Sequence, residues 1–299
     1  MRNDERAGLL FALAGFALLS CGDAVIKSMA GMWSPTAMAA LRYAFGAIGL
    51  ATIVAAREGR GGFAFVAPRA QLLRATGICL SSVGFFSAVM LMPLADATSI
   101  SFTSPMITAL LAALFGSEPA RRDTQFASGI AFAGVLVVLR PNFAALGLSA
   151  LLPLMAALGT SLLIIGNRAA AGKASAMSMQ LILAACAVPL LLLVSWAGDL
   201  SGIPRLAVHV PHWSVIARCA LLACSASVAH YLIYLGTTRA GAATVAPMTY
   251  VQLVVALVLG WVFYGEAPDL VALSGAAVII LAGLYLWHAG RVREPGMTD

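Results

Sequence analysis

The sequence predicts an all-α integral membrane protein with ten transmembrane helices. Hydrophobic residues make up 61% of the 299 residues and charged residues only 10%, which leaves too little polar surface for a soluble chain. Apolar runs of about twenty residues recur along the chain, each long enough to cross a hydrocarbon core of roughly 30 Å. We expect spans at 8–29, 36–56, 72–92, 97–117, 124–140, 147–167, 178–198, 213–235, 242–264 and 269–288.

The positions of the basic residues predict the orientation. With the N-terminus in the cytoplasm, thirteen of the 18 Lys and Arg residues face the cytoplasm, and only Arg140 and Arg205 lie outside. An excess of basic residues inside is typical of membrane proteins. We therefore expect both termini in the cytoplasm and a multi-pass protein of the inner membrane. The net charge of +6 reflects this topology and does not indicate nucleic-acid binding, because the basic residues form no continuous stripe.

Two stretches indicate an internal repeat. A shift of 148 residues aligns SFTSPMITALLAALFGSEP (101–119) with TYVQLVVALVLGWVFYGEAP (249–268), placing Phe102 on Tyr250 and Glu118 on Glu266. Each half, 1–142 and 143–299, then holds five spans. Because five is odd, the second half runs through the membrane upside down relative to the first. Inverted repeats of this kind are typical of secondary transporters, so we expect one integrated transmembrane domain built from two inverted five-helix repeats.

Three motifs carry a resemblance to a known family. SPTAMAALRYAFGAIGL (34–50), with Pro35 at the helix start and Arg42 seven residues on, resembles the second span of the EamA-type drug/metabolite transporters. SPMITALLAALFGSEP (104–119) and LVLGWVFYGEAP (257–268) resemble the family's fourth-span ending and its counterpart in the second half. The resemblance covers essentially the whole chain. It implies a metabolite exporter, and the chain resembles the bacterial amino-acid exporters, including the aromatic amino-acid branch.

The chain departs from internal symmetry at two positions. The second half has Leu253 where the first has Pro105, and Leu183 where the first has Arg42. The two halves therefore present unequal charge to the interior.

Charged residues lie within several predicted spans, and Asp23, Lys27 and Arg42 are the candidates for the substrate site. An ionisable side chain at the centre of a membrane helix costs roughly 2.5–3.5 kcal/mol on insertion scales, so such residues usually face a bundle interior. Asp23 and Lys27 are four residues apart on one helical face. They either line a substrate cavity or form a self-neutralising pair, and Lys27 could also reach the outer interface. Arg42 either anchors a substrate carboxylate through its bidentate fork or bonds the carbonyls of a broken helix.

Polar and aromatic residues in other spans complete the predicted substrate site. Together they suit a mid-sized organic substrate, although hydroxyl, amide and imidazole groups also serve as bonds between membrane helices. Prolines interrupt helices, and two of them fall in the matched spans, where we expect gate or hinge positions. The substrate-site residues are Ser82, Phe86, Thr103, His230, Tyr234, Tyr250 and Gln252, and the hinge residues are Pro105 and Pro247.

These observations predict a secondary transporter that exports a small metabolite, most simply an amino acid, by alternating access. Basic side chains outnumber acidic ones within the spans, which favours a carboxylate-bearing substrate. The alternatives are a drug or organic-cation efflux carrier on the same fold, a membrane-embedded enzyme using Ser82 and His230, or a lipid translocase. We expect no catalytic residue and no cofactor. We also expect no metal, because His209 and His212 lack a third ligand. The expected partners are the substrate and the bilayer, and a monomer is compatible with the sequence.

Overall fold

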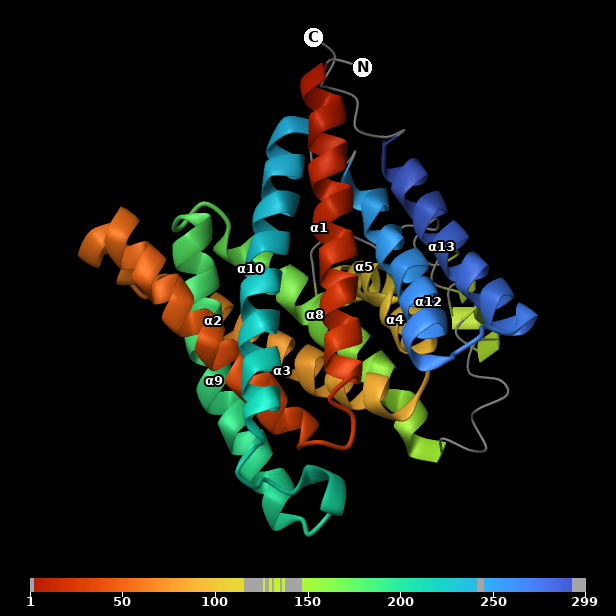
Figure 1. The fold of residues 1–299 in the computed structure, drawn as a ribbon. Coiled ribbons are helices and arrows are strands. Elements are labelled where there is room, and N and C mark those ends of the chain that lie inside the picture. Colours follow the sequence, from red (N-terminus) through yellow and green to blue (C-terminus); the bar gives the residue numbers. More distant parts are fainter. Residues whose placement is uncertain are drawn as a thin grey trace. The chain divides into compact units, whose positions relative to one another are not determined.

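The computed structural model describes residues 3–115, 126, 129–130, 132–134, 136–137, 147–240 and 245–291. Within these ranges every regular element is an α-helix or a 3-10 helix (Figure 1). The α-helices are α1 (Asn3–Lys27), α2 (Pro35–Arg57), α3 (Pro68–Leu91), α4 (Leu94–Ser101), α5 (Ser104–Phe115), α8 (Leu152–Ala170), α9 (Ala176–Leu200), α10 (Trp213–Ala240), α12 (Val251–Tyr264) and α13 (Leu270–Arg291). The 3-10 helices are η1 (Gly59–Phe63), η2 (Gly147–Leu151), η3 (Pro204–Leu206) and η4 (Ala246–Tyr250).

The helical membrane fold predicted from composition is confirmed. Among the described residues, 6 helices are long and apolar enough to cross a bilayer, namely α1, α2, α3, α8 with η2, α9 and α10. The predicted span 97–117 consists of two shorter helices, α4 and α5. Most of the predicted span 124–140, and Glu118 before it, lie outside the described residues. The total of ten spans and the cytoplasmic position of both termini stay predictions.

Proline sets where two of the helices begin. α4 ends at Ser101 and α5 begins at Ser104, so Pro105 lies in the first turn of α5. A proline is tolerated there, because the first N–H groups of a helix have no intrahelical partner. Pro247 similarly lies in η4, and the α-helix proper begins only at Val251. Both prolines therefore mark an interruption of the predicted span.

The chain divides into two compact units. The first unit comprises residues 1–24, 92–150 and 225–299, and the second comprises 25–91 and 151–224. Each unit draws on both predicted halves of the sequence. The boundary predicted between residues 142 and 143 separates the two sequence repeats and not the two compact units. It stays a prediction.

Glycines allow α3 and α8 to pack backbone to backbone in the second unit. A Cβ atom on Gly159 would lie 2.3 Å from the Ser81 nitrogen and 2.5 Å from the Gly77 oxygen. A Cβ atom on Gly84 would lie 2.6 Å from the Leu152 oxygen. Membrane helices gain little from burying apolar surface against each other, so close packing through small residues is what holds them together.

The same device joins α1 and α10 in the first unit. A Cβ atom on Gly15 would lie 2.7 Å from the Ala229 oxygen, and one on Gly236 would lie 2.7 Å from the Gly8 oxygen. In the described residues, each unit thus contains a helix pair whose separation tolerates no larger side chain at these glycines.

A carboxylate joins the end of α2 to the start of α9. Ser175 and Ser178 donate hydrogen bonds of 2.6 and 2.7 Å to the two carboxylate oxygens of Glu58. Ser175 is also the N-cap of α9 and accepts a hydrogen bond from the Ser178 N–H. The two serine hydroxyls lower the pKa of the Glu58 carboxyl below its ordinary value of 4.5. A negative charge at this position also suits the helix N-terminus.

We expect the Glu58→Gln variant to unfold at a lower temperature than the wild type at pH 7. A lowered carboxyl pKa contributes stability above the unfolded value, and this contribution is lost as the pH falls through the folded value. The gap between variant and wild type should therefore narrow at pH 4 and below, where the wild-type carboxylate becomes protonated. Thermal unfolding in detergent at both pH values measures this. An equal gap at both would contradict the assignment. In a protein that already carries Ser178→Ala, the Glu58→Gln substitution should lower the melting temperature by a smaller amount.

Glu266 caps the N-terminus of α4. α12 ends at Tyr264 and is capped by Gly265, which has the left-handed φ of 65°. The N–H of the following Glu266 bonds back to the Gly260 carbonyl. This turn directs the Glu266 carboxylate to the Leu94 N–H, at 2.9 Å. The first N–H groups of a helix need such an acceptor. The residue that the sequence repeat singled out thus joins α12 to α4.

We expect Glu266→Ala to destabilise the protein by about 1–2 kcal/mol, the usual loss for a helix cap. Glu266→Gln keeps an oxygen acceptor and should lose only the part that comes from the charge. Melting temperatures of the two variants in detergent check this order. If Gln proved as damaging as Ala, the hydrogen bond to α4 would not be the source of the stability.

Candidate functional site

Arg42 lies among aromatic side chains on α2 and α3. It is half-buried, about two turns into α2. Its guanidinium carbon is 4.9 Å from the centroid of the Tyr43 ring and 5.9 Å from that of Phe86. Both distances fall within cation–π range. The Nη1 atom also lies 3.4 Å from the Tyr43 hydroxyl.

Tyr43 links this arginine to α3. Ser82 donates a hydrogen bond of 3.2 Å to the Tyr43 hydroxyl. Ser82 and Phe86 are both buried and lie one turn apart on α3. The second unit therefore brings together three of the residues proposed from the sequence, Arg42, Ser82 and Phe86. Tyr43 was not among the residues predicted from the sequence. Its position next to an arginine inside a predicted span could have indicated it.

The second unit carries a large excess of positive charge. All its residues are described, and they include ten Lys and Arg residues but only two acidic ones, Glu58 and Asp199. Glu58 accepts hydrogen bonds from the two serines of α9, and Asp199 accepts one of 2.7 Å from the Val208 N–H. Within this unit, therefore, no carboxylate neutralises Arg42. Its guanidinium is suited to bind an anionic group.

Arg74 plays a different part. Its Nε donates to the Asn167 side chain at 2.6 Å, and its Nη1 donates to the Met179 carbonyl at 3.0 Å and to the Gln71 side chain. The residue is only 3% exposed. Arg74 is one of the thirteen basic residues predicted to face the cytoplasm, whereas the structure buries it among α3, α8 and α9. A buried charge needs all its donors partnered, and these bonds join the three helices.

Lys27 bonds the end of α3. Its Nζ donates to the Val89 carbonyl at 3.1 Å, within the last turn of that helix. The last four carbonyls of a helix lack intrahelical partners, and a cation there is favourable. Asp23 lies one turn earlier on α1, half-buried, and belongs to the first unit. Lys27 thus has a structural contact, and its role toward a substrate stays a prediction.

In the first unit, the two residues aligned by the repeat touch each other. The rings of Phe102 and Tyr250 meet edge to face, with centroids 5.8 Å apart. Each residue lies at an interruption of its span, Phe102 between α4 and α5, and Tyr250 at the end of η4. Gln252 lies nearby in sequence, where its backbone carbonyl accepts a hydrogen bond from Ser20 and its side chain one from Thr249.

The remaining predicted substrate residues of the first unit lie in the segment before α5 and on α10. Thr103 is buried, and its hydroxyl donates to the Ile100 carbonyl at 2.7 Å. His230 and Tyr234 are exposed and one turn apart on α10. The His230 Nδ1 lies 2.6 Å from the Ala226 carbonyl. Among these residues, Thr103 has a hydroxyl already engaged by its own backbone.

The fold and the motifs match a known family over nearly the whole chain. The EamA-like transporter family matches residues 6–140 and again residues 147–287. The chain belongs to this family. It is therefore a multi-pass transporter of the inner membrane, and the family resemblance seen in the sequence is confirmed.

Several curated relatives are named as transporters. A riboflavin transporter of Rhizobium johnstonii is 28% identical over 229 residues, covering 76% of this chain and 72% of the relative. An S-adenosylmethionine uptake transporter of Rickettsia bellii is 24% identical, covering 74% and 73%. Another from Rickettsia conorii is 22% identical over 287 residues, covering 94% and 92%.

A solved crystal structure has the same fold. It superposes with a TM-score of 0.64 at 21% sequence identity, covering 96% of this chain and 99% of that chain. At this identity the likeness establishes the fold alone.

Proposed function

We propose that this chain is a secondary transporter for a small carboxylate-bearing metabolite, with amino acids as the first class, and that it works by alternating access and exports its substrate. The observation that carries the proposal is Arg42. This half-buried guanidinium is flanked by Tyr43 and Phe86, and its unit offers it no carboxylate. A carboxylate fits the planar fork of arginine through two parallel hydrogen bonds.

The neighbours of Arg42 favour a substrate with both charged and apolar parts. The Phe86 ring and the Tyr43 ring provide flat apolar surface, and the Ser82–Tyr43 pair provides hydroxyl groups. Pockets for small organic molecules combine such apolar walls with a few polar groups. Aromatic amino acids meet both conditions. An organic cation is disfavoured, because the second unit carries ten basic residues against two acidic ones.

The interruptions in the first unit support alternating access. α4 and α5 are separated at Phe102 and Thr103, and η4 precedes α12, so two predicted spans have non-α-helical backbone. Interrupted membrane helices in corresponding positions of two halves are typical of secondary transporters. Pro105 and Pro247 lie at these interruptions, and we propose them as hinge positions.

The names of the relatives point to two kinds of substrate, an amino-acid derivative and a flat heterocyclic compound. S-adenosylmethionine, transported by the Rickettsia relatives, itself carries an amino-acid carboxylate. Riboflavin, transported by the Rhizobium relative, has a flat ring system and no carboxylate. The second candidate function is therefore uptake of a flat heterocyclic metabolite, which would stack on the guanidinium and the aromatic rings.

Uptake of radiolabelled compounds into liposomes that contain the purified protein tests the proposal. The panel comprises aromatic, neutral, acidic and basic amino acids, S-adenosylmethionine and riboflavin, with empty liposomes as control. Saturable uptake of amino acids or S-adenosylmethionine is the expected result. Saturable uptake of riboflavin alone would favour the second candidate. No uptake of any carboxylate-bearing compound would contradict the proposed substrate class.

A further inference from the structure

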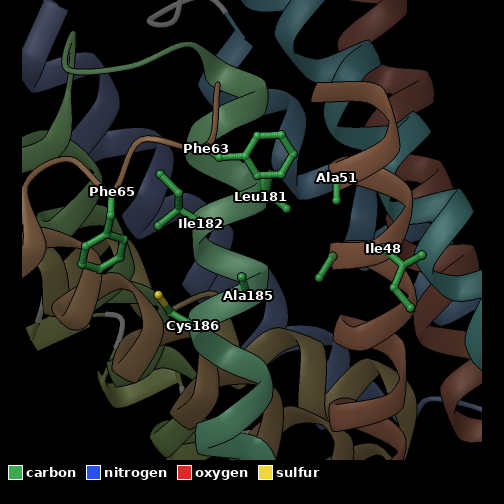
Figure 2. A pocket seen from close by; sticks show the side chains of 9 residues that line it. Ile48, Ala51, Phe63, Phe65, Leu181, Ile182, Ala185 and Cys186 are labelled. Carbon is green, nitrogen blue, oxygen red and sulfur yellow. The ribbon is translucent and has the colours of Figure 1, made fainter. Parts of the chain in front are cut away.

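An apolar hollow lies on the second unit between α2, α9 and the segment that follows α2. It has a volume of about 430 Å³. Figure 2 shows Ile48 and Ala51 on α2, Phe63 and Phe65 from the segment after it, and Ala185 among the residues of α9. Every residue that lines it is alanine, isoleucine, leucine, phenylalanine or cysteine.

The hollow is open to its surroundings, and its side chains offer water no hydrogen-bonding partner. Ile48, Phe63 and Phe65 are 63%, 48% and 56% exposed. Water enters a site only where polar groups can bond it, and no side chain of this lining carries a hydroxyl, an amide or a charge. α2 and α9 are both long and apolar enough to cross the bilayer, so the medium around their apolar surface is lipid. A hydrocarbon chain is therefore the occupant whose chemistry matches the lining.

The segment that contributes Phe63 and Phe65 to the hollow also carries positive charge. Arg57, Arg60 and Arg69 are all exposed on residues 57–69, the stretch that contributes Phe63 and Phe65. The acidic residue of this stretch, Glu58, bonds the serines at the start of α9. Basic residues beside a membrane helix attract anionic lipid headgroups.

This hollow is separate from the site around Arg42. Ala51 lies nine residues after Arg42, which is about two and a half helical turns, so the two residues lie on opposite sides of α2. The Arg42 side of α2 meets Phe86 on α3, whereas the Ala51 side meets Leu181 and Ala185 on α9.

We propose that this hollow is a lipid-binding site, in which one acyl chain of an anionic phospholipid lies between α2 and α9 and its headgroup meets the arginines of residues 57–69. The site does not depend on the transported substrate. It would make the second unit sensitive to the anionic lipid content of the membrane.

Photo-crosslinking in liposomes tests the site. The full-length protein is reconstituted with phosphatidylglycerol that carries a diazirine in its acyl chain, or with phosphatidylcholine that has the same labelled chain. Peptide mass spectrometry then locates the crosslinks. We expect phosphatidylglycerol to label peptides containing Ile48, Phe65 or Cys186 at least fivefold more than phosphatidylcholine does. Equal labelling by the two lipids, or labelling spread evenly over all helices, would overturn the proposal.

Two sets of variants separate the hollow from the charge. Ala185→Trp fills the hollow and should reduce this labelling severalfold, whereas Leu192→Trp adds the same side chain at an exposed position of α9 outside the lining and should not. A triple variant in which Arg57, Arg60 and Arg69 are each changed to Gln should lose the preference for phosphatidylglycerol. The labelled peptides should stay the same as in the wild type. If Leu192→Trp reduced the labelling as much as Ala185→Trp does, the hollow would not be the lipid site.

Discussion

Replacing Arg42 with alanine is expected to raise the concentration for half-maximal transport of a carboxylate-bearing substrate by roughly 10- to 100-fold. Hydrogen bonds to a charged group contribute about 1.5–3 kcal/mol, and each 1.4 kcal/mol corresponds to a factor of ten. Arg42→Lys keeps the charge and loses the planar fork, so it should fall between the wild type and the alanine variant. Concentration-dependent uptake into liposomes measures all three proteins.

Arg218 supplies the matched control for this experiment. It also lies within a predicted span, and its Nη1 donates to the Ser28 carbonyl at 3.0 Å and lies 3.5 Å from the Met32 sulfur. Arg218→Gln removes one positive charge from the same unit and should leave the half-maximal concentration within about twofold of the wild type. If the two variants weakened transport equally, the effect would be one of overall charge, and the specific anchor at Arg42 would be wrong.

Replacing Gly159 with valine is expected to prevent the second unit from folding. Even the first carbon of the new side chain would lie 2.3 Å from the Ser81 backbone nitrogen, and backbone cannot move aside as a flexible side chain can. Overpacking of this kind costs several kcal/mol, which is a large part of the stability of an ordinary domain. The yield of monodisperse protein in detergent and its melting temperature report the loss.

Gly46 on α2 provides the corresponding control. A Cβ atom there meets nothing within 4 Å, and its backbone is helical. Gly46→Ala should therefore leave stability unchanged or raise it by about 0.4–1 kcal/mol through the unfolded chain. A folded and fully stable Gly159→Val variant would show that α3 and α8 do not pack as closely as described.

The apolar runs predicted the helices well because length and hydropathy are local properties. The predicted span 36–56 became α2 (Pro35–Arg57), and 178–198 became α9 (Ala176–Leu200). The prediction was less accurate where a break interrupts an apolar run. At Phe102 and Thr103 the α-helix stops although the sequence stays apolar, and hydropathy alone does not report backbone geometry. Pro105 indicated that the helix is interrupted. The break itself lies two residues before Pro105, because a proline is tolerated in the first turn of the helix that follows.

The candidate site depended more on tertiary contacts. Arg42 could be selected from the sequence because a charge in an apolar span is costly. Tyr43 and its bond to Ser82 could not, since they depend on how α2 packs against α3. Arg74 looked like an ordinary cytoplasmic arginine until the structure placed Asn167 and Met179 around it. The bond between Lys27 and Val89 was hidden for the same reason, since the two residues are 62 positions apart.

The most direct test of the central claim is substrate counterflow. Liposomes containing the protein are preloaded with an unlabelled carboxylate-bearing substrate from the panel, and entry of a trace of the labelled compound is followed at zero driving force. A secondary transporter that alternates its access predicts a transient accumulation of label above equilibrium, absent in empty liposomes and absent when the carboxylate is masked as a methyl ester. Entry that rises only to equilibrium, or equal accumulation of acid and ester, would contradict the account.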